Sequence, residues 1–100
     1  MTKQELAVKM QEAGAWVPGK TVKLDFGGDG SILLDGSNSL VTEDSDAAAD
    51  TTIKVSWEDW QAMATGQMDG MTAFMTGKLK VEGDMGNAMQ LQGVVAKLRS

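Results

Sequence analysis

The sequence predicts an α+β domain: a five-stranded, mixed but mainly antiparallel sheet with helices packed on one face. Five short segments alternate apolar and polar residues or are rich in β-branched residues, as strands are. Other segments begin at capping residues, continue with apolar residues at helical spacing and end at glycine. A chain of 100 residues, 42% hydrophobic and 23% charged, suits one domain with one core. We therefore predict a single domain over residues 1–100.

The order of the elements predicts part of the topology. The predicted helices span residues 2–14, 56–65, 69–76 and 85–98. The predicted strands span residues 22–26, 31–34, 39–42, 51–55 and 78–82. The glycine-rich residues 27–30 favour a hairpin turn over a phosphate loop, because a strand and not a helix follows them. The first three strands then form an antiparallel meander. Two helices separate the last two strands, and because such a crossover normally joins parallel strands, we expect these two to be parallel.

Composition excludes several classes of function. The chain has no cysteine and no histidine, which removes disulfides, thiolate chemistry and the usual ligands of zinc and haem. A net charge of −5 without a basic cluster argues against nucleic acid as a partner. The amino-terminal segment does not resemble a secretory signal, and no apolar run is long enough to span a membrane. We expect a cytoplasmic protein without a cofactor.

No catalytic or metal-binding motif emerges. A Gly-x-Ser-x-Gly elbow is absent, and without histidine a hydroxyl nucleophile lacks its common base. The acidic residues 43–50 lack the ligand spacing of an EF-hand and are interpreted as a surface loop. Lys80, Glu82 and Asp84 are better explained as alternating charges on the solvent-facing side of a half-exposed strand than as an acid–base cluster. We therefore expect no enzyme, no catalytic residue and no metal site.

The methionines form the most informative pattern, because six of the eight fall within residues 63–89. Methionine adapts to irregular apolar partners and specifies tight packing poorly. Two alternatives follow: a soft core that happens to contain methionine, or the pliable wall of a cavity for an apolar ligand. The stripes that carry this pattern are Met68, Met71 and Met75 with Phe74 beside them, and Met85, Met89 and Gln92 at i, i+4 and i+7. For Gln92 two roles stay open, holding the polar end of a ligand or facing solvent.

Residues 73–92, AFMTGKLKVEGDMGNAMQLQ, resemble the signature of the sterol carrier protein 2 domain family. The upstream stretch TIKVSWEDW, residues 52–60, is similar to the segment that precedes this signature in the family. The resemblance implies a five-stranded sheet with helices on one face and a hydrophobic tunnel between them. It also implies binding and transfer of sterols, phospholipids, fatty acids or fatty acyl-CoA without chemical change. Carried over by position, the tunnel wall includes Phe74, Met75, Met85, Met89 and Leu91, with Gln92 near the polar end of the ligand.

The sequence thus predicts a non-catalytic lipid-binding or lipid-transfer protein that holds a fatty acid, acyl-CoA, phospholipid or sterol. Its partners would be the lipid or fatty-acyl ligand and, transiently, a membrane. The alternative is an accessory protein-interaction module with a closed core and no bound lipid. The predicted ligand-binding residues are Met71, Phe74, Met75, Met85, Met89, Leu91 and Gln92.

Overall fold

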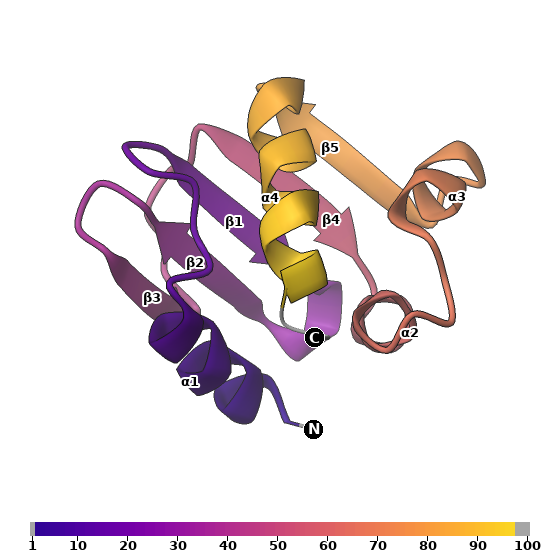
Figure 1. Ribbon diagram of the computed structural model, residues 1–100, viewed down its shortest axis with the longest axis horizontal. Helices are drawn as coiled ribbons and strands as arrows, with labels where there is room; N and C mark the ends of the chain where they lie inside the picture. Colours follow the sequence, from indigo (N-terminus) through magenta and orange to yellow (C-terminus); the bar gives the residue numbers. More distant parts are fainter. Residues whose placement is uncertain (1, 98–100) are drawn as a thin grey trace.

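The structure, a computed structural model, describes residues 2–97 and forms one five-stranded sheet with four α-helices (Figure 1). The helices are α1 (Lys3–Ala13), α2 (Trp57–Ala64), α3 (Gly70–Met75) and α4 (Met85–Lys97). The strands are β1 (Thr21–Asp25), β2 (Ser31–Asp35), β3 (Leu40–Glu43), β4 (Thr51–Val55) and β5 (Leu79–Gly83). The predicted α+β class and the mixed five-stranded sheet are confirmed.

The strand order is β3-β2-β1-β4-β5, and one prediction about it is wrong. The meander β1-β2-β3 is antiparallel as expected, with a short 3₁₀ turn at Gly27–Asp29 inside the first hairpin. The parallel pair is β1–β4, whereas β4 and β5 are antiparallel, with Val55 opposite Leu79. The reason is visible in Figure 1: α2 and α3 lie near the end of the sheet where β4 finishes. The chain therefore re-enters the sheet at that same end, and β5 runs back along β4.

One face of the sheet is apolar and carries the helices. Its buried side chains come from four strands and form one cluster with α1, α2, α3 and α4. They are Val22, Leu24, Ile32, Leu34, Ile53, Val55 and Leu79. The alternate residues of β4 and β5 point the other way, and there Lys54 forms an ion pair with Glu82 at 2.9 Å. This hydrogen-bonded contact raises the pKa of Lys54. The helices thus cover the apolar face of the sheet, and the Lys54–Glu82 ion pair lies on the other face.

Helix α1 covers the β3 edge of the sheet. A capping box between Thr2 and Glu5 begins the helix, and Gly14 in the left-handed conformation ends it. Gln11 bridges α1 to β3: its Nε2 donates to the Ser39 carbonyl at 3.1 Å, and its Oε1 accepts from the Val41 amide at 2.7 Å. These contacts continue the ladder of an otherwise open edge strand onto the helix.

Lys3 and Asp44 join the start of α1 to the end of β3, and this pair predicts a pH effect. The hydrogen bond from Lys3 Nζ, 2.6 Å from Asp44 Oδ1, and then the amide of Ser31, lower the pKa of Asp44 below its usual 3.8. Since the folded pKa is depressed, the stabilisation is present above the unfolded pKa, near 4, and is lost as pH falls through the folded value. Urea titrations should therefore show Asp44→Asn less stable than the parent at pH 6, with a gap that narrows towards pH 3. A gap that stays constant or widens would contradict this assignment.

Gly36 lies where β2 leaves the sheet against the turn before β1. Its amide donates to the Lys20 carbonyl at 2.8 Å, and its own carbonyl accepts from the Gly19 amide at 3.2 Å. A Cβ here would lie 2.7 Å from the carbonyl carbon of Val17 and 2.8 Å from the carbonyl oxygen of Lys20. Because backbone atoms cannot move aside, Gly36→Ala is expected to destabilise the fold by about 3 kcal/mol in urea unfolding. The control Gly28→Ala meets no atom within 4 Å and should stay within about 0.5 kcal/mol of the parent. Equal stabilities for the two variants would refute the steric argument.

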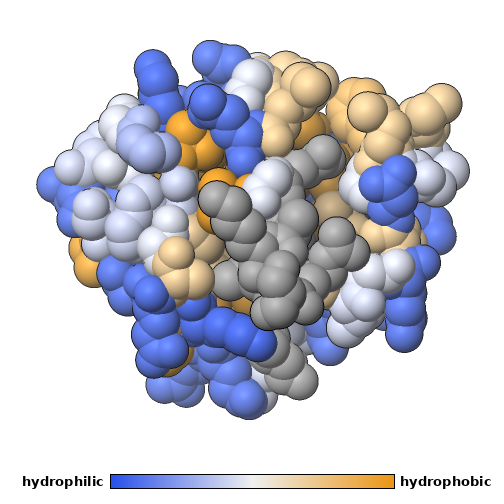
Figure 2. Space-filling model, viewed as in Figure 1, coloured by the Kyte–Doolittle hydropathy of each residue, from blue (hydrophilic) through white to orange (hydrophobic). Residues whose placement is uncertain are grey.

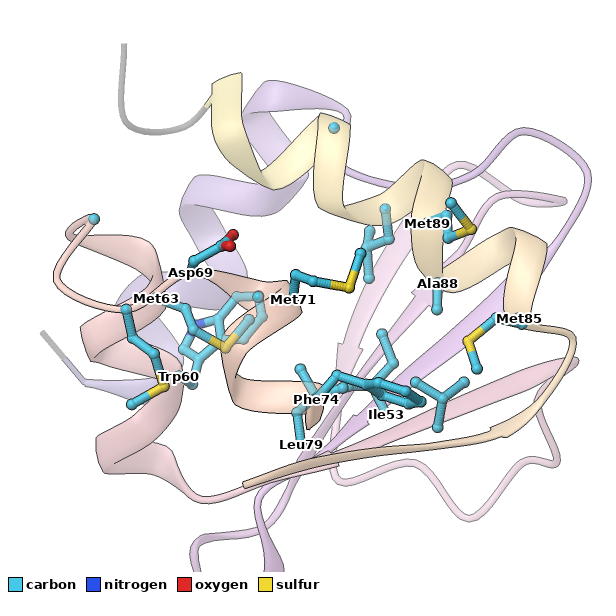
Figure 3. A pocket seen from close by; sticks show the side chains of 16 residues that line it. Ile53, Trp60, Met63, Asp69, Met71, Phe74, Leu79, Met85, Ala88 and Met89 are labelled. Atoms are coloured by element: carbon cyan, nitrogen blue, oxygen red, sulfur yellow. The ribbon is translucent and has the colours of Figure 1, made fainter. Parts of the chain in front are cut away.

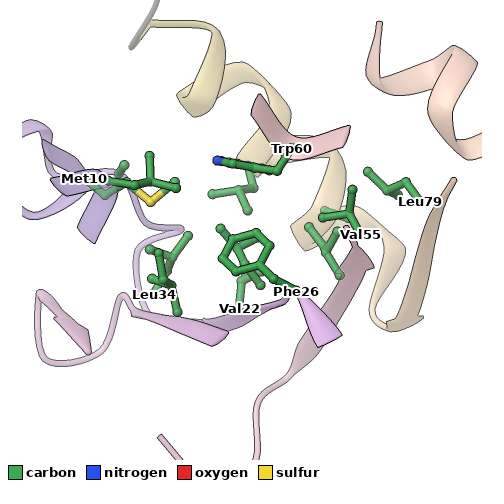
Figure 4. Packing of buried hydrophobic residues seen from close by; sticks show 14 of the residues in the cluster. Met10, Val22, Phe26, Leu34, Val55, Trp60 and Leu79 are labelled. Carbon is green, nitrogen blue, oxygen red and sulfur yellow. The ribbon is translucent and has the colours of Figure 1, made fainter. Parts of the chain in front are cut away.

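The centre of the core is aromatic (Figure 4). Phe26, at the end of β1, packs edge-on against Trp57, with ring centroids 5.1 Å apart and planes at 81°. Its ring also lies 6.0 Å from the ring of Trp60, which is only 3% exposed. The Ser56 hydroxyl caps α2 by accepting the Asp59 amide at 3.1 Å, and so sets both tryptophans on the first turn of the helix. Phe26 thus holds α2 against the sheet and fixes the position of this helix.

Candidate functional site

A cavity of about 650 Å³ lies on the helical face, between the β4–β5 edge and helices α2, α3 and α4 (Figure 3). Its volume falls in the range of about 300–1,000 Å³ that is usual for small-molecule sites. Most of its wall is apolar. The lining residues are Ile53, Trp60, Met63, Gly66, Met68, Asp69, Gly70, Met71, Phe74, Leu79, Val81, Met85, Ala88, Met89, Leu91 and Gly93.

The floor of the cavity consists of inward-facing sheet residues. Ile53 of β4 lies opposite Val81 of β5 in the strand register, and Leu79 is the next inward residue along β5. Period-two alternation places these three side chains on the helical face. The floor is therefore rigid, because it belongs to the hydrogen-bonded sheet.

Helix α3 forms a short, thinly anchored part of the wall. Ala73 is its buried residue, and the Ala73 carbonyl accepts the Lys78 amide at 2.9 Å as the chain turns into β5. Gly77 makes this turn at φ 78°, a conformation that favours glycine. With so little buried surface, α3 presents Met71 and Phe74 at the rim and not in the core.

Helix α4 closes the cavity from above and is tied to β4 by a buried polar contact. Asn87 Nδ2 donates to Thr51 Oγ1 at 3.1 Å, and Thr51 Oγ1 donates to the Asp84 carbonyl at 2.7 Å. Both side chains are buried. Buried polar groups are costly unless they are paired, so this contact holds the first turn of α4 at one position over the sheet. Ala88 and Leu91 then face the cavity from the same helix.

The structure brings together five of the seven predicted site residues. Those that line the cavity are Met71, Phe74, Met85, Met89 and Leu91. Met75 is not among the lining residues, and its side chain is 78% exposed, because it is the last residue of α3. The side chain of Gln92 lies outside the described part of the structure.

Eleven of the sixteen described lining residues were not among the predicted site residues, and Trp60 and Asp69 are two of them. In the sequence, Trp60 only continues the helix that begins after Ser56, and Asp69 only indicates the start of the next helix. Neither residue indicates a cavity. Figure 4 shows the Trp60 nitrogen on the side of Met10, away from Leu79. Among the described residues this nitrogen has no hydrogen-bond partner. Trp60 therefore contributes an apolar ring, and not a donor, to the wall near Leu79.

An exposed apolar surface surrounds the cavity mouth. Figure 2 shows hydrophobic side chains gathered over α3 and the first half of α4. These rim residues are large and at least two-fifths exposed; they are Met71, Phe74, Met75, Met85 and Met89. Contiguous exposed apolar patches mark interaction sites or ligand grooves more often than scattered single residues do.

The described wall of the cavity is almost uncharged. Asp69 is the one ionisable side chain among the described lining residues. The described residues contain no group of three or more His, Cys, Asp or Glu side chains placed to hold a metal ion. In the part of the chain that the structure describes, no helix has both the length and the apolar character needed to cross a bilayer.

Comparison with known proteins agrees with this geometry. Residues 3–96 match the model of the SCP-2 sterol transfer family. The chain belongs to the SCP-2 sterol transfer family. The match covers the sheet and every described residue of the cavity wall, which confirms the family resemblance seen in residues 52–60 and 73–92.

Individual SCP-2 relatives differ in how much of their length the chain covers. Sterol carrier protein 2 of Bos taurus is 48% identical over 54 residues, 54% of this chain and 10% of that protein. The chain thus spans about a tenth of the length of such curated relatives. Among solved structures, sterol carrier protein 2 like 2 of Aedes aegypti is 22% identical, with a TM-score of 0.72 over 91% of this chain and 94% of that chain. A second Aedes aegypti protein, sterol carrier protein 2 solved in complex with palmitate, has 22% identity and a TM-score of 0.75 over 92% of each chain.

Proposed function

We propose that this chain is a non-catalytic lipid-binding domain whose cavity holds the apolar part of one lipid molecule. The observation that carries the proposal is the cavity itself, about 650 Å³, lined mainly by apolar side chains and opening onto an apolar rim. Family membership supports the same function, and a protein of the same fold has been solved with palmitate.

The composition of the cavity wall supports binding of lipid hydrocarbon chains with low selectivity among them. Five methionines line the cavity, namely Met63, Met68, Met71, Met85 and Met89. Such flexible thioether side chains repack around different apolar shapes. Burying sixteen methylenes contributes on the order of 13 kcal/mol gross, at roughly 0.8 kcal/mol each. The entropy lost on association reduces this to affinities of about micromolar.

A second candidate function is the accessory interaction module, in which the rim docks on another protein. The exposure of Met75 and Met89, 78% and 64%, is the observation that favours it. Transient docking of the same rim on a membrane would instead serve lipid transfer. The role of Gln92 and the cytoplasmic location stay predictions from the sequence.

Native mass spectrometry of the purified protein separates the two functions. For the carrier we expect an adduct with the mass of a lipid, and quenched or shifted tryptophan emission when a long-chain ligand is added, because Trp60 lines the cavity. A protein without bound lipid whose emission does not respond to any acyl ligand would contradict the carrier function. That result would leave the interaction module as the better account.

A further inference from the structure

Asp69 places a negative charge on the wall of a cavity whose other described lining residues are uncharged. It precedes α3 as its N-cap residue, yet its carboxylate accepts no capping hydrogen bond from the helix. The ion pairs found among the described residues, Lys3–Asp44 and Lys54–Glu82, do not involve it. Figure 3 shows the carboxylate at the end of the cavity where Trp60 and Met63 lie. The acceptor oxygens of Asp69 are therefore available to a molecule in the cavity.

No described lining residue offsets this charge. The lining contains neither lysine nor arginine among the residues that the structure describes, and the rest of the wall is apolar side chain or glycine. A ligand carboxylate at this end would meet a like charge, with no cationic side chain among the described lining residues to offset the repulsion. A hydroxyl or ammonium group there would instead donate a hydrogen bond to the carboxylate of Asp69, a charge-assisted bond of the stronger kind.

We infer that Asp69 is a specificity-determining residue, which makes this cavity prefer lipids whose head group donates a hydrogen bond over lipids with a free carboxylate. The inference rests on the proposed lipid-binding function and names its ligand class. The relevant ligands are long-chain alcohols, sterol-like alcohols and amines. Because Asp69 is exposed, solvent screens its charge, and the preference should be about fivefold and not several orders of magnitude.

Calorimetric titration with three ligands of one chain length tests this inference. Decylamine, decanol and decanoate differ only in the head group, which is cationic, neutral and anionic at pH 7.5. At low salt we expect the parent protein to bind decylamine about fivefold more tightly than decanol, and decanoate about fivefold more weakly than decanol. Added salt, 0.5 M NaCl, should reduce both ratios towards one, since the Debye length shortens to a few ångströms.

The variant Asp69→Asn identifies the residue responsible. Asparagine is an equally good N-cap residue, so the fold of α3 should be retained. We expect this variant to gain about fivefold affinity for decanoate, to lose about fivefold for decylamine and to change less than twofold for decanol. The control Asp46→Asn removes the same charge from the loop between β3 and β4, outside the cavity lining, and should leave all three affinities within twofold.

The possible outcomes distinguish the role of Asp69 from lipid binding itself. Binding of all three ligands with equal affinity, or head-group ratios that Asp69→Asn does not change, would overturn the role of Asp69 while leaving lipid binding intact. Failure of all three ligands to bind either the parent or the variant would overturn the proposed function itself.

Discussion

Replacing Ala88 with tryptophan is expected to weaken the binding of a long-chain ligand by about 50-fold. Ala88 is buried on α4 and faces the middle of the cavity, above Ile53 and Phe74 (Figure 3). An indole ring there would exclude about three methylenes of the ligand from burial, and at roughly 0.8 kcal/mol each this is about 2.4 kcal/mol. Displacement of a fluorescent fatty-acid analogue measures the loss.

Two controls make this plugging experiment specific. Ala48→Trp adds the same ring at an exposed position in the loop after β3 and should bind like the parent. Urea unfolding of Ala88→Trp checks that the ring fills existing space, in which case the loss of stability stays below about 3 kcal/mol. A folded Ala88→Trp protein that binds with parental affinity would show that the ligand does not occupy this cavity.

Truncating Trp60 to alanine is expected to lower the free energy of unfolding by about 3–5 kcal/mol. The indole is 3% exposed, packs beside Phe26 and belongs to the core and to the cavity wall at once. Since a domain of this size is stable by about 5–15 kcal/mol, the variant would lose a large part of its stability. Urea or thermal unfolding followed by circular dichroism provides the measurement.

Phenylalanine at position 60 provides the matched comparison. Trp60→Phe keeps most of the buried ring and removes an indole N–H that has no partner among the described residues, so it should cost less than about 1.5 kcal/mol. Trp57→Ala, at a half-buried position on the same turn of α2, should cost less than Trp60→Ala. A Trp60→Ala protein within 1 kcal/mol of the parent would contradict the assignment of Trp60 as the anchor of α2.

Local rules predicted the elements well because their signals are contained in the elements themselves. The capping box of Thr2 and Glu5, the serine cap of α2 and the alternation in β1 and β4 each determine structure within a few residues. The direction of β5 was predicted wrongly, because it depends on where α2 and α3 lie relative to the sheet. That position is decided by long-range packing of residues such as Trp60 on Phe26.

The candidate site was predictable where one helix carries its residues. Met85 and Met89 share a face of α4 by i, i+4 spacing, and both line the cavity. Met71 and Met75 have the same spacing on α3, but this helix has only six residues, and of these two methionines only Met71 lines the cavity. Asp69 and Trp60 could not be grouped with these methionines from sequence, because the fold alone brings α2, α3 and α4 around one space.

The most direct test of lipid binding in this cavity uses the methionines as reporters. With ¹³C-labelled methionine methyl groups, each residue gives a separate signal as decanol is added. The account predicts shifts for the five lining residues Met63, Met68, Met71, Met85 and Met89. Met10, buried on the core-facing side of α1, and Met75, exposed and outside the lining, should stay unchanged. Saturable shifts confined to Met75, or no shift at any lining methionine, would contradict the central claim that this cavity holds the lipid.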